Sequence, residues 1–470
     1  MLAIAVTGPV GSGKSTLLGA IAAEEAARGR RVDGFVAVAG RRGGVGAGAG
    51  AETYTLRWAA TGEEVPFATR GAGAPGRRYA FDTAGVARVV AWAAGLASQP
   101  VADLVVLDEF GAAEARGEGL APAGAGVLAA APASLAVAVR EGLLADAEAW
   151  LGRPFDVVVD AGATGAGDRL REACLARDDW TRVGLFGAGA GGIEFTVGSA
   201  LHTARVPMRG LGLATTQSVV LSFAGDGLGR RVRVAGVAFV AAGLKALSPS
   251  GSRLRPMLAI TMQGVLFALG TRIVGWNRAG LFVGGALVGT WAATQGILMQ
   301  YLLVGQDLFR GYEAVAGWTA ARGMGLPALA TVVALWALFY ALTAGSITAW
   351  AWRRTSVAAR VERALGRAGA VSVGGPDRTW RGAAAGALRD LARPAFWVPV
   401  AVLAAILLAA GSPAERAAWI GLRAFAVGLV LFALARRLDP RRAGAWLRRR
   451  GRWGPALAMD RALGPVDGRQ

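Results

Sequence analysis

The 470-residue chain has one cysteine, one histidine and two lysines. With Cys174 alone, no disulfide forms within the chain, and Cys174 and His202 are too few for a zinc site built from Cys and His. The single histidine also excludes a Ser-His-Asp triad in the N-terminal half. Basic positions are otherwise arginine, so the two lysines, Lys14 and Lys245, are unusually informative about function.

Charged residues are also scarce, at 18%, whereas hydrophobic residues reach 54%. Soluble domains contain about 25% charged residues, and disordered chains are far less apolar. This composition argues against one large soluble enzyme and indicates that part of the chain lies in lipid. The formal net charge of +19 fits either a nucleic-acid-binding protein or a membrane protein with Arg-rich loops.

Residues 1–178 predict an α/β domain with a mostly parallel sheet. Short apolar runs alternate with helical spacing, which is typical of βαβ units. Among them, we expect strands at 2–7, 32–38, 53–58, 104–107, 134–139 and 155–159, and helices at 15–28 and 83–97. The Gly-rich segment Arg41–Ala51 is expected to be a mobile loop.

A phosphate-binding loop lies between the first strand and the first helix. It matches G-x-x-x-x-G-K-[ST] through Gly8, Pro9, Val10, Gly11, Ser12, Gly13, Lys14 and Ser15. Backbone N–H groups and the helix N-terminus would bind phosphate, and Lys14 would reach the β- and γ-phosphates of ATP or another NTP. Ser15 would bind Mg²⁺, with Thr16 as a secondary phosphate contact.

A second acidic element follows the apolar strand 104–107. Asp108 at the end of this strand would hold Mg²⁺ directly or through water, opposite the loop. The next residue, Glu109, is placed to orient and deprotonate an attacking water molecule. Together with Lys14, it forms the predicted catalytic pair.

These motifs resemble the small bacterial and archaeal nucleoside triphosphatases first described from thermophiles. The likeness covers about 175 residues and rests on the loop, on Asp108-Glu-Phe-Gly-Ala-Ala-Glu114, on Gly34–Arg42 and on Thr61-Gly-Glu63. It implies a RecA-like fold that hydrolyses NTP to NDP and phosphate with broad base tolerance. Glu114 would be a supporting acidic residue and Arg140 a phosphate-side residue, although a solvated surface charge is an equal alternative for each.

From about residue 183, apolar stretches separated by Arg, Pro and Gly predict an all-α polytopic membrane region. The eight expected spans lie near 183–202, 211–225, 234–247, 257–271, 279–304, 326–352, 395–411 and 416–435. They define a six-span domain at 183–352, an Arg-rich linker at 353–394, a two-span hairpin at 395–435 and a basic tail at 436–470.

Arginine placement predicts the orientation of this region. Three clusters, at 230–233, 353–393 and 436–452, fall on the side of the N-terminal domain when eight spans are counted. We therefore expect a bacterial inner-membrane protein with its N-terminal domain and tail in the cytoplasm. Arg205, Arg209, Arg253 and Arg255 depart from this pattern. No RNA-binding motif is present, so we expect anionic lipid head groups and no specific nucleic acid as partners of the tail.

Residues 183–352 also resemble the substrate-binding S component of energy-coupling factor vitamin transporters. The likeness rests on Gly198–Gly210, Leu254–Gly264 and Gly275-Trp-Asn277. It implies capture of a small-molecule solute and, in that family, separate transporter subunits. Glu194 and His202 lie on one predicted helix and are candidate solute contacts, or they only form hydrogen bonds between helices.

Three functions remain open. The chain is a membrane-tethered nucleoside triphosphatase, a transporter whose NTPase domain drives or regulates uptake, or a nucleotide-sensing or kinase-like P-loop protein. Glu109 beside Asp108 favours hydrolysis over phosphotransfer.

Overall fold

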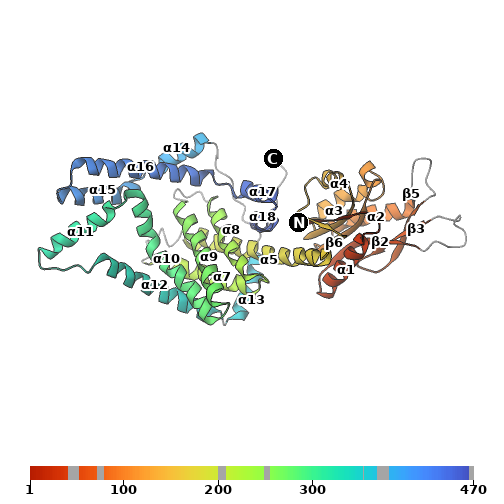
Figure 1. Ribbon diagram of the computed structural model, residues 1–470, viewed down its shortest axis with the longest axis horizontal. Helices are drawn as coiled ribbons and strands as arrows, with labels where there is room; N and C mark the ends of the chain where they lie inside the picture. The colour runs from red at the N-terminus through yellow and green to blue at the C-terminus, as the bar shows by residue number, and fades with distance from the viewer. Residues whose placement is uncertain are drawn as a thin grey trace. The chain divides into compact units, whose positions relative to one another are not determined.

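The computed structural model describes residues 1–40, 52–70, 79–198, 208–247, 254–352, 354–367 and 380–464. Two compact units divide the chain, Met1–Arg177 and Asp178–Gln470. The first unit contains the strands and the second is helical (Figure 1). This confirms the predicted fold class of an α/β domain followed by a helical region.

The sheet of the first unit has eight strands in the order β5-β4-β3-β2-β6-β7-β1-β8. Five are parallel: β1 (Leu2–Gly8), β2 (Val32–Ala39), β6 (Leu104–Phe110), β7 (Ser134–Arg140) and β8 (Val157–Asp160). The other three extend the sheet beyond β2 in antiparallel pairing: β3 (Glu52–Trp58), β4 (Glu64–Arg70) and β5 (Tyr79–Phe81). The mostly parallel sheet fits a P-loop NTPase.

Helices cover this sheet because its central strands are apolar on both faces. Leu2, Ile4 and Val6 of β1 are each at most 1% exposed. Helix α1 (Lys14–Ala27) packs against β1, β2, β6 and β7. The remaining helices of the sheet region include α2 (Thr83–Leu96), α3 (Gly124–Ala130) and α4 (Leu144–Leu151). Their apolar faces and the strands form one hydrophobic core drawn from residues 3–155.

The second unit is built from helices of very different length. Helix α5 (Ala166–Ile193) contains the boundary between the units and is followed by a π-helical turn, Glu194–Gly198. The next helices are α7 (Arg209–Asp226), α8 (Ala235–Lys245), α9 (Leu254–Val274), α10 (Arg278–Val304), α11 (Asp307–Ala320), α12 (Leu329–Ala351) and α13 (Thr355–Arg367). The last are α14 (Trp380–Leu391), α15 (Pro394–Ala409), α16 (Ala414–Arg437), α17 (Pro440–Arg449) and α18 (Trp453–Leu463).

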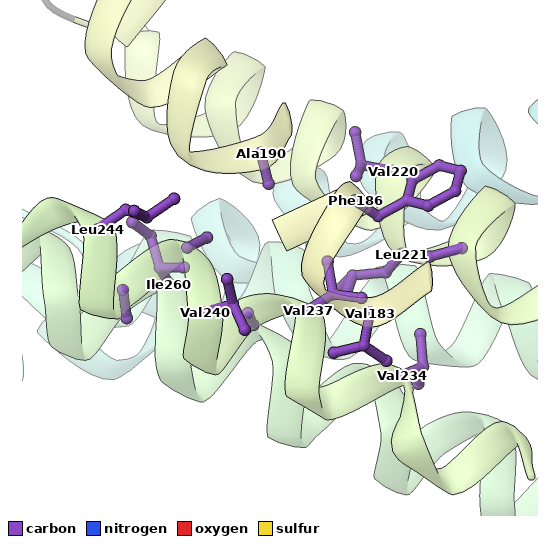
Figure 2. Packing of buried hydrophobic residues seen from close by; sticks show 14 of the residues in the cluster. Val183, Phe186, Ala190, Val220, Leu221, Val234, Val237, Val240, Leu244 and Ile260 are labelled. Carbon is purple, nitrogen blue, oxygen red and sulfur yellow. The ribbon is translucent and has the colours of Figure 1, made fainter. Parts of the chain in front are cut away.

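The main core of the second unit joins segments that are distant in sequence. Figure 2 shows Val183 and Phe186 of α5 among side chains of α7 and α8, including Val220, Leu221 and Val237. Close helix packing depends on small residues. A Cβ on Gly187 would lie 2.5 Å from the Val240 side chain, so α5 and α8 approach at a distance that only glycine allows there.

Among the described residues, four helices are long and apolar enough to cross a membrane: 255–274, 278–304, 329–351 and 414–434. A fifth span arises if α14 and α15, bent by 51° at their break, count as one. The predicted spans at 257–271, 279–304, 326–352 and 416–435 coincide with the four. The four other predicted stretches do not qualify alone within the described residues. Helix α8, for example, has 11 residues and rises only about 16 Å.

The outer surfaces of two of these helices are apolar. Only 17% of the most apolar window of α12 and of α16 is buried. Large side chains such as Leu335, Trp336, Trp419 and Leu422 are exposed on them. In a water-soluble protein such continuous apolar surface would be covered, so these faces suit contact with lipid.

Candidate nucleotide site

The loop between β1 and α1 curves tightly over residues 8–13. Gly8 has φ +146°, and a Cβ there would lie 2.5 Å from the Ser12 hydroxyl oxygen. Gly13, with φ +91°, precedes α1, and no side chain caps this helix end. Side chains of L-residues rarely adopt these angles, so glycine leaves the loop backbone and the helix N–H groups accessible to a phosphate. Pro9, Val10 and Gly11 form the exposed tip.

Lys14 points back into this loop. Its side chain is 4% exposed, and its Nζ donates hydrogen bonds to the carbonyl oxygens of Gly8 and Pro9, each at 3.0 Å. The Ser12 hydroxyl is buried without a hydrogen-bond partner. Ser15 is half-buried and Thr16 exposed in the first turn of α1. The predicted loop residues therefore surround one ammonium group.

Asp108 lies on β6, two strands from the loop in the order β6-β7-β1. Its residue is 1% exposed, and its Oδ2 accepts a hydrogen bond from the Ala37 N–H at 3.0 Å. Burial raises its pKa to about 6, although the Ser15 side chain and the Ala37 N–H each lower it. The contribution of Ser15 indicates that the predicted metal ligands Ser15 and Asp108 lie near each other.

The second carboxylate oxygen of Asp108, Oδ1, is buried and has no hydrogen-bond partner. A buried, unpaired carboxylate oxygen is costly unless a cation or a donor balances it. The residues therefore fit a Mg²⁺ ion held by one carboxylate and one hydroxyl, with phosphate and water as its other ligands. No cluster of three or more His, Cys, Asp or Glu side chains occurs among the described residues, so the protein offers no closed all-protein metal cage there.

Glu109 faces a different environment from its neighbour. The pairing of β6 with β7 shifts register between Leu107 and Phe110, exactly where the two acidic residues lie. The side chain of Glu109 is 25% exposed, and its Oε1 accepts hydrogen bonds from Arg140 Nε and pairs with Arg140 Nη2, both at 2.8 Å. The two adjacent carboxylates therefore differ in environment: Asp108 is buried, whereas Glu109 is partly exposed and paired with Arg140.

Arg140 ends β7 beside the loop. It is in register with Gly8 of β1, so its backbone is adjacent to the start of the phosphate loop. The electrostatic influence of Glu109 and of Tyr79 raises the pKa of Arg140, against a lowering by burial. Tyr79 was not predicted from the sequence, because β5 has only three residues, too few to show an alternating pattern.

Glu114 binds the backbone of the segment that follows β6. It is 8% exposed, and its carboxylate accepts hydrogen bonds from the N–H groups of Gly111 (2.9 Å) and Leu120 (3.3 Å). Burial raises its pKa. Of the two interpretations of Glu114, the solvated surface charge is wrong, because the residue is buried and its oxygens accept hydrogen bonds from backbone N–H groups.

The predicted solute contacts of the helical unit are only partly described. Glu194 lies in the π-helical turn, and its carbonyl oxygen accepts a hydrogen bond from Lys245 Nζ at 3.4 Å. His202 lies outside the described residues, as do Arg41 and Arg42 and most of the Gly198–Gly210 segment. The structure therefore does not show whether Glu194 and His202 come together.

Comparison with known proteins finds one similarity, which lies in the first part of the chain. Residues 3–148 match a family model described as NTPase. This segment includes the phosphate loop, Asp108, Glu109, Glu114 and Arg140, and it contains all strands of the mostly parallel sheet except β8. No curated protein and no solved structure gives a significant match to the chain.

Proposed function

We propose that this protein is a Mg²⁺-dependent nucleoside triphosphatase that is anchored in the bacterial inner membrane. It hydrolyses ATP or another NTP to NDP and phosphate. The observation that carries the proposal is the buried Lys14 ammonium inside the glycine loop, two strands from the unpaired carboxylate oxygen of Asp108. The match of residues 3–148 to an NTPase family supports nucleotide hydrolysis in general.

The residues divide the work by position. The loop from Gly8 to Gly13 binds the phosphates through backbone N–H groups, and Lys14 exchanges its two loop carbonyls for phosphate oxygens. Ser15 and Asp108 would hold Mg²⁺, which supplies positive charge to the phosphate oxygens. Glu109 orients a water molecule in line with the γ-phosphate and accepts its proton.

Loss of Lys14 tests this assignment. Lys14→Ala in the full-length protein should abolish release of phosphate from ATP. No other lysine lies in the N-terminal unit, so none there can replace the lost ammonium group. Arg88→Ala is a suitable control, since Arg88 pairs with Glu63 away from the loop. Phosphate release at the wild-type rate by Lys14→Ala would refute the site.

The orientation and domain arrangement are part of the proposal. A cytoplasmic N-terminal domain (1–178) and tail (436–470) place the hydrolytic site where nucleotides are abundant. Four spans keep both ends on one side but put the Arg-rich linker (353–394) on the other, whereas eight spans keep all three Arg clusters together. Labelling of an Arg360→Cys variant from each side of the membrane separates these arrangements, once the native Cys174, which is buried, is shown to be unreactive.

A second candidate function is solute uptake, driven or regulated by the NTPase. It is favoured by polar groups inside the helical unit: Thr215 Oγ1 and Gln217 Nε2 are buried on α7 without hydrogen-bond partners. Such groups in a lipid-embedded bundle are expensive unless a ligand or a partner satisfies them. The likeness to S components adds a vitamin-type solute and separate transporter subunits. Turnover in liposomes with and without a panel of vitamins tests this function, and stimulation by one vitamin would support it.

A kinase-like or nucleotide-sensing role is the third candidate. Two acidic residues at the end of β6, of which one remains half-exposed, favour water activation over phosphotransfer.

A further inference from the structure

We infer that Arg140 is a positioning residue that senses the γ-phosphate: it holds Glu109 in an ion pair and releases it only when a triphosphate draws its guanidinium away. The inference rests on the proposed hydrolytic function and adds a regulatory step to that site.

The ion pair occupies one oxygen of the carboxylate that is proposed to act on water. Both Arg140 nitrogens within bonding distance contact the same atom, Glu109 Oε1, at 2.8 Å. Two charge-assisted hydrogen bonds from one guanidinium hold this oxygen in a fixed position. While the pair is intact, Oε1 is therefore occupied by Arg140, and the carboxylate is held toward the guanidinium rather than toward a water molecule.

The position of Arg140 gives the pair its sensitivity to ligand. β7 lies between β1 and β6, and Arg140 is in register with Gly8, where the phosphate loop begins. The same strand end therefore adjoins the phosphate loop on one side and Glu109 on the other. A terminal phosphate carries about two negative charges and three acceptor oxygens, two of which can accept parallel hydrogen bonds from a guanidinium, so it attracts Arg140 more strongly than a singly charged carboxylate.

The surroundings permit the guanidinium to move. The side chains of Arg140 and Glu109 are 29% and 25% exposed, so the pair is solvated and its rupture is inexpensive. Glu114, by contrast, is buried and fixes Gly111 next to the pair. A hypothetical Cβ on Gly111 would lie 3.6 Å from Arg140 Cζ, so the guanidinium lies directly over this fixed backbone.

Affinities for a non-hydrolysable ATP analogue and for ADP, both with Mg²⁺ and the full-length protein, test the inference. Glu109→Gln should tighten binding of the triphosphate analogue about two- to fivefold, because a solvated ion pair no longer competes for Arg140. ADP affinity should stay the same, since ADP has no γ-phosphate. Arg140→Ala should weaken binding of the analogue but leave ADP binding unchanged. Arg140→Lys should bind the analogue with intermediate affinity, because a lysine forms no bidentate contact.

A matched pair controls for general charge effects. Arg57 and Glu64 form an ion pair of similar length, 2.6 Å, on the β3–β4 hairpin. Glu64→Gln should leave both affinities unchanged. Unchanged ADP affinity also shows that each variant is folded.

The double variant decides between competition and simple repulsion. If Arg140 senses the phosphate, Glu109→Gln tightens analogue binding less in the Arg140→Ala background than in the wild type. Equal or greater tightening there would mean that Glu109 only repels the nucleotide, and this would overturn the inference. Failure of the wild type to bind either nucleotide would instead refute the proposed function.

Discussion

Asp108→Asn should make the N-terminal unit more stable and at the same time inactive. A fragment of residues 1–177 is one compact unit, and it contains both the hydrophobic cluster drawn from residues 3–155 and further buried residues such as Leu18 and Leu170. In the absence of metal and nucleotide, the Asp108 carboxylate is buried with Oδ1 unpaired. Asparagine keeps an oxygen for the Ala37 N–H and removes the charge.

The magnitude follows from the pKa of Asp108. Burial raises this pKa from 3.8 to about 6. A difference of about two units corresponds to about 3 kcal/mol at roughly 1.4 kcal/mol per unit. Because the folded pKa is the higher one, folding favours the protonated form. The penalty is absent below pH 3.8, grows as the pH rises toward about 6, and is complete above it.

Urea unfolding of both fragments in EDTA between pH 4 and pH 8 measures this effect. The stability advantage of Asp108→Asn over the wild type, measured as the free energy of unfolding, should be about 2.5 kcal/mol larger at pH 8 than at pH 4. The comparison cancels the titration of all other groups. Mg²⁺ with a non-hydrolysable ATP analogue should stabilise the wild type much more than the variant. A variant that is less stable at pH 8 without metal would refute the account of Asp108.

Three further predictions concern chemistry, folding and topology. Glu109→Gln should retain nucleotide binding but slow turnover by about 10²-fold or more, as measured by phosphate release, and loss of binding instead would make Glu109 structural. Gly34→Ala should destabilise the N-terminal unit by at least about 1–3 kcal/mol in urea unfolding, because Gly34 has φ +96° and a Cβ would lie 2.0 Å from the Val106 carbonyl oxygen; an unchanged midpoint would contradict this. A reporter fused after Gln470 should be active in the cytoplasm, and a periplasmic signal would exclude an even number of spans.

The parallel strands and the phosphate loop are predictable because their signals are local. β1 and β6 are continuous apolar runs that end at the loop and at Asp108, and a buried strand needs little else. Strand β4, which lies between β3 and β5, was not predicted, since Pro66 interrupts its pattern and three of its seven residues are exposed. Tyr79 and the Ala37 N–H depend on strand order, which no short window encodes.

The helical unit shows the opposite limit. Hydropathy identifies α10 and α12 well because lipid-facing helices are apolar all round. It cannot distinguish a span from a short buried helix such as α8, whose apolar side chains meet α5, α9 and α18 rather than lipid. Similarly, the many arginines of residues 436–470 led to the prediction of a basic tail, so the apolar helix α18, with its seven buried residues, was not predicted.

The position of α18 has a consequence for biosynthesis. Ala458, Met459 and Leu463 belong to the same core as Val183 and Val240, which are made far earlier. A ribosome must therefore release almost the entire polypeptide before this core is filled. Until then, the apolar surface that α18 covers is exposed to chaperones and proteases, and a deletion of residues 453–463 should cause degradation of the protein.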